Sequence, residues 1–292
     1  MRTLIKQLAV HTLSSRLNEL KALSQHHQGE SCYIIGDGAS LKWFDLANLQ
    51  SIPCFSLGYI NIHNQSDTLD LRYRLITEPF CFFPLVPPAQ LADRKIGLNP
   101  LASIYQMSCA TLSHESYILT HLSNILLLHG MKNILYLQDV LPGLNPSFAT
   151  RCEQASENIF NGSIKTAISL SILMGFRKVF LLGCDYTHKY GRRQHWHEYG
   201  PGKVQNTPLY AKTFFDIARD FAEIITITLD GPGECLPHET YREHTNREPV
   251  YRENHQLCSF EHLLTLSKYS TYQTFPATHQ NKKKPLSVDF GA

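Results

Sequence analysis

Short apolar runs alternate with segments of helical character along most of the chain. The runs lie at residues 31–35, 53–57, 72–77, 133–137, 178–182 and 224–229. Helices are expected between them at residues 114–129, 163–174 and 209–223. Strands that alternate with helices form a parallel sheet that is covered on both faces. The pattern therefore predicts an α/β, Rossmann-like fold whose ligands bind at the carboxyl ends of the strands.

Four regions are expected along the chain. Residues 1–30 are an N-terminal helical appendage or an interface helix of a homo-oligomer, because leucines recur near helical spacing over residues 3–24. Residues 31–230 make the Rossmann-like domain. Residues 231–277 form a lid, which is a polar loop over residues 231–253, and a helix at residues 259–269. Residues 278–292 are a mobile basic tail.

Composition narrows the location and the partners of the chain. The 292 residues are 43% hydrophobic and carry a net charge of +2, which excludes a disordered chain and a general electrostatic grip on nucleic acid. Neither a membrane-spanning run nor an apolar signal-peptide core is found, so a cytoplasmic location is expected. The eight cysteines stand singly, as reduced core thiols do. The lysines at 282–284 are either solvated or a peripheral contact with an anionic membrane.

The first candidate motif follows the first strand as Gly36-Asp37-Gly38-Ala39-Ser40-Leu41. A strand that ends in Gly-x-Gly and opens a helix presents bare backbone N–H groups, which favours a phosphate or nucleotide site. The third glycine of a dinucleotide fingerprint is absent at Leu41, and no Lys-Ser/Thr pair of a Walker loop follows. A plain tight turn is the alternative.

Two further motifs follow. Asn161-Gly162-Ser163 opens the helix at residues 163–174, and the next strand delivers Asp185 to the sheet edge, where it is a ligand-holding residue or a capping one. The run His195-Trp196-His197-Glu198 then supplies imidazoles to a chain with 15 histidines. His195 is a candidate general acid or base, and a His-x-His pair can also hold a metal.

In this order the motifs resemble the bacterial sialyltransferases of glycosyltransferase family 42 and related domains over about residues 32–237. The related domains are the nonulosonic-acid transferases of flagellin and the archaeal-type 6-hydroxymethylpterin diphosphokinases. The resemblance implies a GT-A-like variant of the Rossmann fold. It also implies transfer of a sialic acid-like sugar from a CMP-activated donor to a bacterial surface glycan, with inversion and without a metal.

The resemblance also implies roles for single residues. The implied nucleotide-binding residues are Gly36, Asp37, Gly38, Ser40, Asn61, Glu78, Asn161, Gly162 and Ser163. His195 matches the catalytic histidine, with His197 as the fallback, and Asp185 matches the acidic residue after the Leu-x-Gly strand. The family has a tyrosine where this chain has Thr187, so Tyr186 or Tyr190 takes its place and helps to stabilise the leaving phosphate.

Two other functions stay open at this point. A diphosphokinase of the pterin type would need Mg²⁺, for which Asp37, Glu78 and Asp185 are the candidate ligands. In a non-catalytic nucleotide-binding protein, the histidine-rich loop would be incidental and His195 would have no role. Chelation of metal and substitution of His195 separate the three functions.

Overall fold

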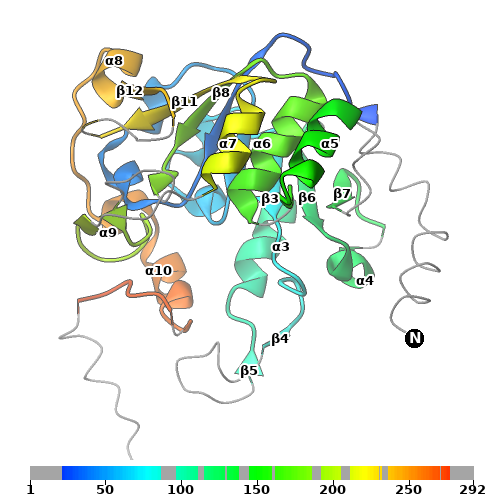
Figure 1. Ribbon diagram of the computed structural model, residues 1–292. Helices are drawn as coiled ribbons and strands as arrows, with labels where there is room; N and C mark the ends of the chain where they lie inside the picture. The colour runs from blue at the N-terminus through cyan, green and yellow to red at the C-terminus, as the bar shows by residue number, and fades with distance from the viewer. Residues whose placement is uncertain are drawn as a thin grey trace, which may run out of the picture.

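The computed structural model describes residues 22–86, 97–110, 115–128, 130–137, 145–159, 162–185, 192–204, 211–229, 231, 236–269 and 271–276. Its centre is an eight-stranded sheet with the order β12-β11-β8-β1-β2-β3-β6-β7, in which every neighbouring pair is parallel (Figure 1). The strands are β1 (Ser31–Ile35), β2 (Cys54–Leu57), β3 (Tyr73–Ile76), β6 (Tyr117–His121), β7 (Ile134–Leu137), β8 (Lys178–Leu182), β11 (Glu223–Thr228) and β12 (His238–Thr240). The predicted α/β fold with a parallel sheet is confirmed.

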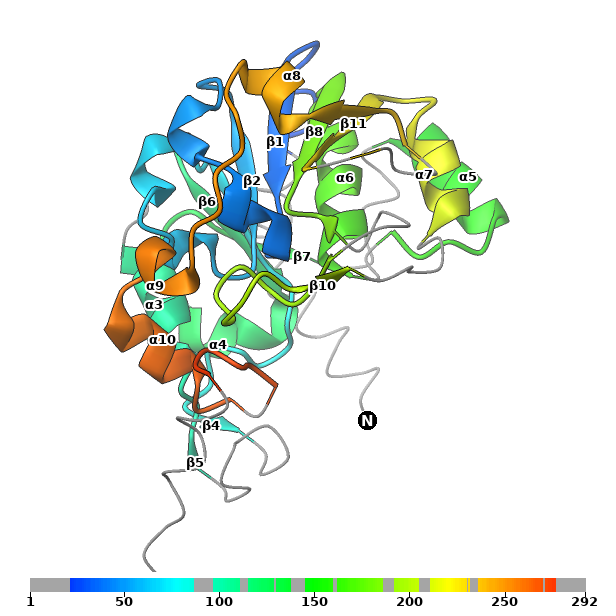
Figure 2. The same cartoon turned by 90° about the vertical axis from the view of Figure 1, so that its left-hand side faces the viewer.

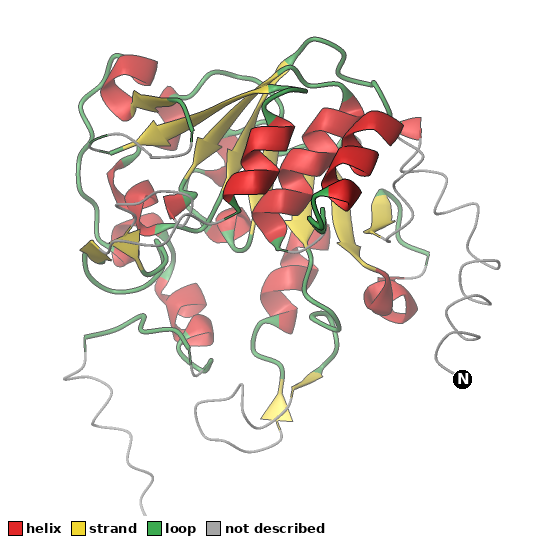
Figure 3. Ribbon diagram, viewed as in Figure 1, coloured by secondary structure: helices red, strands yellow, loops and turns green. Residues whose placement is uncertain are grey.

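Helices cover both faces of this sheet (Figure 3). On one face lie α5 (Pro146–Gln154), α6 (Ser163–Met174) and α7 (Lys212–Ala218), which Figure 1 shows side by side. The other elements are α3 (Ala102–Ala110), α4 (Ile125–Leu128), α8 (Tyr241–Thr245), α9 (Asn254–Leu257), α10 (Phe260–Leu266) and the 3-10 helices η1 (Ala39–Trp43), η2 (Leu46–Asn48), η3 (Ile60–Ile62), η4 (Ser66–Thr68) and η6 (Leu122–Asn124). Two short hairpins pair β4 (Leu85–Val86) with β5 (Gly97–Leu98) and β9 (Arg192–Arg193) with β10 (Lys203–Val204).

The two faces of the sheet carry separate hydrophobic clusters. In β1, Cys32 and Ile34 belong to the cluster under α5, α6 and α7, while Tyr33 and Ile35 belong to the cluster on the opposite face. This division follows from the two-residue period of a strand. Because both faces are covered, the central strands are almost continuously buried, and their sequences read as apolar runs.

The strand order places a topological switch point beside β1. From β1 the chain moves outward through β2, β3, β6 and β7, and it then returns to the other side of β1 through β8, β11 and β12 (Figure 2). Ligands of open parallel sheets bind in the crevice above such a point, at the carboxyl ends of the strands. Here that crevice lies above β1 and β8.

Two of the expected segments are wrong. Within residues 114–129 the chain forms β6 and then η6 and α4 instead of one long helix. Ile118 and Leu119 pack on opposite faces of the sheet, so the apolar run has the period of a strand. The loop expected at residues 231–253 contains β12, which lies at the edge of the sheet, and α8, which begins with a capping box between Thr240 and Glu243.

Of two other predicted helices, one has the expected bounds and one is shorter. α6 has the predicted bounds and ends at Gly175, whose φ of 94° is the left-handed conformation that stops a helix. α7 is shorter than residues 209–223, since Glu223 already begins β11. The helix expected at residues 3–24 lies outside the described residues except at its end, and the tail at 278–292 lies outside them entirely. Among the described helices, none has the length and apolarity to cross a membrane.

Candidate functional site

A pocket of about 460 Å³ opens at the switch point of the sheet. Its wall is built by the segments that follow β1, β2, β3 and β8, together with the start of α6, one residue of α3 and the segment after α10. The lining residues are Gly36, Asp37, Leu57, Gly58, Tyr59, Glu78, Tyr105, Ser163, Ile164, Gly183, His195 and Tyr272. A cavity of this size suits a nucleotide or a drug-sized molecule.

The loop after β1 packs against β8 and uses three of its backbone amides to do so. The backbone N–H groups of Gly36 and Gly38 donate to the carbonyls of Leu182 and Gly183, at 2.8 and 2.7 Å. The N–H of Ser40 donates to Oδ2 of Asp185 at 2.8 Å. The expectation of a phosphate cradle at these three amides is therefore wrong, because each already has a protein partner.

Close approach of two chain segments explains the glycine at position 38. A Cβ atom on Gly38 would lie 2.4 Å from Oδ2 of Asp185 and 2.5 Å from the carbonyl oxygen of Gly183. No real Cβ atom comes so near, so the loop after β1 can reach β8 only with glycine at this position. Gly36 and Gly183 line the pocket nonetheless, as backbone wall.

Asp37 is a partly buried carboxylate that connects the loop to two other segments. Its oxygens accept hydrogen bonds from the N–H of Tyr59, at 3.0 and 3.1 Å, and from Nε1 of Trp196 at 3.0 Å. Burial raises the pKa of Asp37 to about 6, although the charge of His195 and these hydrogen bonds act in the opposite direction. Asp37 thus carries a negative charge near neutral pH beside the imidazole of His195.

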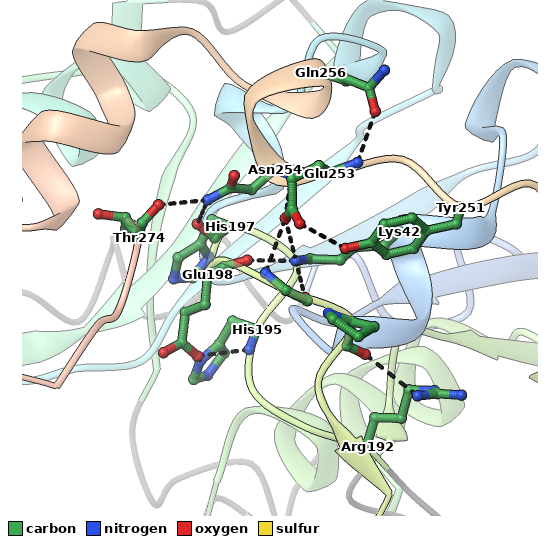
Figure 4. Close-up of polar contacts among 12 residues, drawn as sticks. Lys42, Arg192, His195, His197, Glu198, Tyr251, Glu253, Asn254, Gln256 and Thr274 are labelled. Carbon is green, nitrogen blue, oxygen red and sulfur yellow. Dashed lines mark hydrogen bonds and ion pairs between the residues drawn. The ribbon is translucent and has the colours of Figure 1, made fainter. Parts of the chain in front are cut away.

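His195 forms an acid–imidazole pair with Glu198 (Figure 4). Its Nδ1 lies 2.9 Å from Oε2 of Glu198, which also accepts the backbone N–H of His195 at 2.8 Å. Burial alone would raise the pKa of Glu198, but hydrogen bonds from His195 and from the N–H of Gln273 lower it below its usual value. Glu198 is then ionised, so Nδ1 carries the proton and Nε2 is the nitrogen through which His195 would exchange a proton.

The surroundings favour a charged His195. Burial lowers the pKa of its imidazole, but the hydrogen bond to Glu198 and the charges of Asp37, Glu198 and Asp185 more than reverse this and raise the pKa above 6.5. An antiparallel bridge to Gly38 fixes the backbone of His195 beside the loop after β1. His195 is thus held at the pocket wall from both its backbone and its ring.

His197 does not reach the pocket. Its ring is fully buried and stacks on His195 at a centroid distance of 5.1 Å and an interplanar angle of 16°. Neither ring nitrogen has a hydrogen-bond partner within the described part of the chain, and burial lowers the pKa of the ring well below its usual value. His197 is therefore a neutral packing residue, and His195 is the better candidate for the base.

The N-terminus of α6 faces the pocket through Ser163 and Ile164. Its N-cap residue, Gly162, has a φ of 93° and supplies no side-chain cap. Ser163 Oγ lies 3.0 Å from Oγ1 of Thr77, at the end of β3. This 12-residue helix, unlike the short η1, has an N-terminus that can attract an anion.

The remaining expected site residues divide into three groups. Glu78 lines the pocket with a side chain that is exposed to solvent. Asp185 and Asn61 do not line the pocket. Asp185 accepts a hydrogen bond from the N–H of Ser40, and the side-chain amide of Asn61 donates to the carbonyl of Ile104 in α3 at 3.4 Å. Tyr186, Tyr190 and Asn161 lie outside the described residues.

Three tyrosines that the sequence analysis did not identify as site residues line the pocket. Tyr105 donates to the hydroxyl of Tyr59 at 3.2 Å, and the hydroxyls of Tyr59 and Tyr272 are also 3.2 Å apart. Burial raises the pKa of all three, so they remain neutral hydrogen-bond donors. Tyr59 directly follows Gly58 at the end of β2, which is a local signal, but nothing in the sequence places Tyr105 or Tyr272 at the pocket.

The carboxylates proposed for Mg²⁺ do not gather. Oxygens of Asp37 and Asp185 are bonded to backbone amides, and within the described ranges no group of three or more His, Cys, Asp or Glu residues has the arrangement of a metal site.

Comparison with known proteins gives a likeness of fold. No protein-family model matches the chain, and no curated protein matches it. Among solved structures it is similar to the sialyltransferase CstII from Campylobacter jejuni in complex with the substrate analogue CMP-3FNeuAc, with a TM-score of 0.44 and 12% identity, over 82% of this chain and 99% of that one. The complex of CstII with cytidine-5'-monophosphate gives a TM-score of 0.43 and 13% identity, over 82% and 98% of the two chains.

Proposed function

We propose that the chain is a glycosyltransferase that moves a nonulosonic, sialic acid-like sugar from a CMP-activated donor to a hydroxyl of a glycan. The observation that carries the proposal is the meeting of two features in one pocket at the switch point. One is the His195–Glu198 pair, and the other is the N-terminus of α6 at Ser163 and Ile164. The order of the sequence motifs, which resembles that of glycosyltransferase family 42, supports it independently.

The start of α6 is proposed to receive the donor phosphate. The first backbone N–H groups of a helix have no partner within the helix, and the helix dipole adds a partial positive charge there. A CMP-activated sugar carries a single phosphodiester charge, which one such terminus can match. Ser163 supplies a hydroxyl at the same place.

His195 is proposed as the general base. Its Nε2 takes the proton of the acceptor hydroxyl while the acceptor oxygen forms a bond to the anomeric carbon. The bond from that carbon to the phosphate oxygen breaks, and CMP leaves with the electron pair. Glu198 keeps the Nδ1 proton in place and stabilises the imidazolium that results. Tyr186, Tyr190 or Ser163 is the proposed donor to the leaving phosphate.

The proposed base gives a pH dependence with a defined sign. A base must be neutral to act, so kcat/KM should rise with pH through a pKa that lies above 6.5. Glu198→Gln removes the carboxylate that raises this pKa, so the acid limb of the profile should move to lower pH. The turnover at pH 8 should fall roughly tenfold or more, because an amide no longer fixes the tautomer. Glu261→Gln, on an exposed turn of α10, is the matched control. An unmoved acid limb in Glu198→Gln would contradict the pairing.

The test of the function is cleavage of a defined donor. CMP-N-acetylneuraminic acid is incubated with the purified chain, with and without lactose as acceptor, and CMP release is followed in EDTA and in Mg²⁺. We expect CMP release that is equal in the two conditions. Release of AMP from ATP with a hydroxymethylpterin, dependent on Mg²⁺, would instead identify a diphosphokinase. Failure to bind or cleave any CMP-activated nonulosonic acid would reject the proposed function.

A further inference from the structure

Lys42 is a completely buried ammonium group near the candidate site. Its side chain is 0% exposed, although it belongs to η1, which starts one residue after Gly38. Lysine is almost never fully buried unless its charge is matched. The charge of Lys42 must therefore be balanced by hydrogen-bond acceptors around it.

Two of the three partners of Lys42 lie on the turn that carries His195 (Figure 4). Its Nζ donates to the backbone carbonyls of Glu198 and Gly200 and to Oε1 of Glu253, the last at 3.1 Å. An ammonium group has three donors, so all three are used. Two of them fix carbonyls that are two residues apart, which sets the path of the chain just after His195.

The N-terminus of α9 holds the same turn from another side. Oε1 of Glu253 also accepts the N–H of Gly200 at 3.0 Å. The amide of Asn254 donates to the carbonyls of His197 and Thr274, at 2.8 and 2.9 Å. The turn at residues 195–200 is thus clamped by segments that lie far from it in the sequence.

The contacts that hold this turn also affect the imidazole of His195. Lys42 and Glu253 fix the backbone around Glu198, whose carboxylate holds Nδ1 of His195. The same η1 supplies the N–H of Ser40 to Asp185. One short element therefore sets Asp185 and the His195 turn relative to the pocket.

We propose that Lys42 is a positioning residue, which holds the turn at residues 195–200 so that Glu198 keeps the imidazole of His195 directed at the pocket. The proposal rests on the proposed function only for the effect on turnover. The geometry of the pair can be measured without any substrate.

The test compares Lys42→Met with Lys178→Met in the full-length chain. Methionine keeps a long side chain but leaves the carbonyls of Glu198 and Gly200 without their donor. Lys178, whose partner is Glu223, lies at the opposite, amino end of β8 and is the control. Imidazole ¹⁵N NMR, assigned with His195→Gln, gives the tautomer and the pKa of His195.

We expect the Nδ1–H tautomer of His195 to be lost and its pKa to fall in Lys42→Met and not in Lys178→Met. The titratable groups around His195 are all retained in the variant; they are Asp37, Asp185, Glu198, His197 and Tyr272. Loss of the nearby positive charge by itself would raise the pKa, so a fall reports a change of position. For donor cleavage, kcat should drop about 100-fold with KM within about threefold.

An unchanged tautomer and pKa in folded Lys42→Met would overturn the proposal. If that variant does not fold, Glu253→Gln decides, because its amide oxygen can still accept the N–H of Gly200 but no longer matches the ammonium charge. We expect a smaller change in the same direction, and no change would overturn the proposal. If the wild type cleaves no donor while the tautomer still changes in Lys42→Met, the proposed function fails and the positioning role stands.

Discussion

Replacing His195 with glutamine should lower turnover of a CMP-activated donor by about 10²- to 10⁴-fold, which is what a general base contributes. Binding of the donor should change little, because proton transfer occurs only in the transition state. Steady-state rates and calorimetric binding of CMP to the same preparations measure the two quantities.

Two further histidines serve as comparisons. His238→Gln, on the exposed edge strand β12, should leave turnover unchanged. His197→Phe keeps the ring stacked on His195 and removes two nitrogens that have no partner among the described residues, so turnover should stay within a few-fold. Equal loss of turnover in His195→Gln and His197→Phe would show that the two rings act together and that the base is misassigned.

Gly58→Ala should be among the most destabilising substitutions in the chain. A Cβ atom there would lie 1.6 Å from Oδ2 of Asp37, and Gly58 has a φ of +60°. The carboxylate would have to move, which would leave the N–H of Tyr59 and Nε1 of Trp196 without their acceptor. We expect the free energy of unfolding to fall by roughly 3–5 kcal/mol, as measured by urea denaturation.

Gly130→Ala separates steric overlap from backbone strain. Gly130 has a φ of +86°, but nothing lies within 4 Å of the position of its Cβ atom. Its substitution should cost about 1–2 kcal/mol, because only the left-handed backbone conformation is strained. If the two alanine variants lose equal stability, the close contact between Gly58 and Asp37 does not hold the loop after β1 in place.

The sequence predicts the sheet better than the site because strands are local patterns. The runs at 31–35 and 178–182 are apolar without interruption, which is typical of strands buried on both faces. Residues 117–121 were mistaken for helix, since Ile118 and Leu119 fit either period until the neighbouring strands are known. The edge strand at His238–Thr240 is polar and half-exposed, so it has no apolar signal.

The site depends on contacts between distant segments, and these have no local pattern. The sequence places His195 near the loop after β1 only through a resemblance. It gives no sign that Glu198, three residues later, bonds to the ring, or that Lys42 and Asn254 clamp the turn. Tyr272 reaches the pocket from a segment far along the chain. The glycines at 36 and 38 allow the loop to approach β8 closely, and their amides bond to Leu182 and Gly183; the local motif does not reveal these partners.

A crystal structure of the chain soaked with CMP tests whether the start of α6 receives the donor phosphate. We expect the phosphate to lie at the N-terminus of α6, within hydrogen-bond distance of the backbone N–H groups of Ser163 and Ile164. We also expect Nε2 of His195 to face the space where the sugar would be attached. CMP bound outside this pocket, or bound in it with the phosphate directed away from α6, would show that α6 does not receive the donor phosphate.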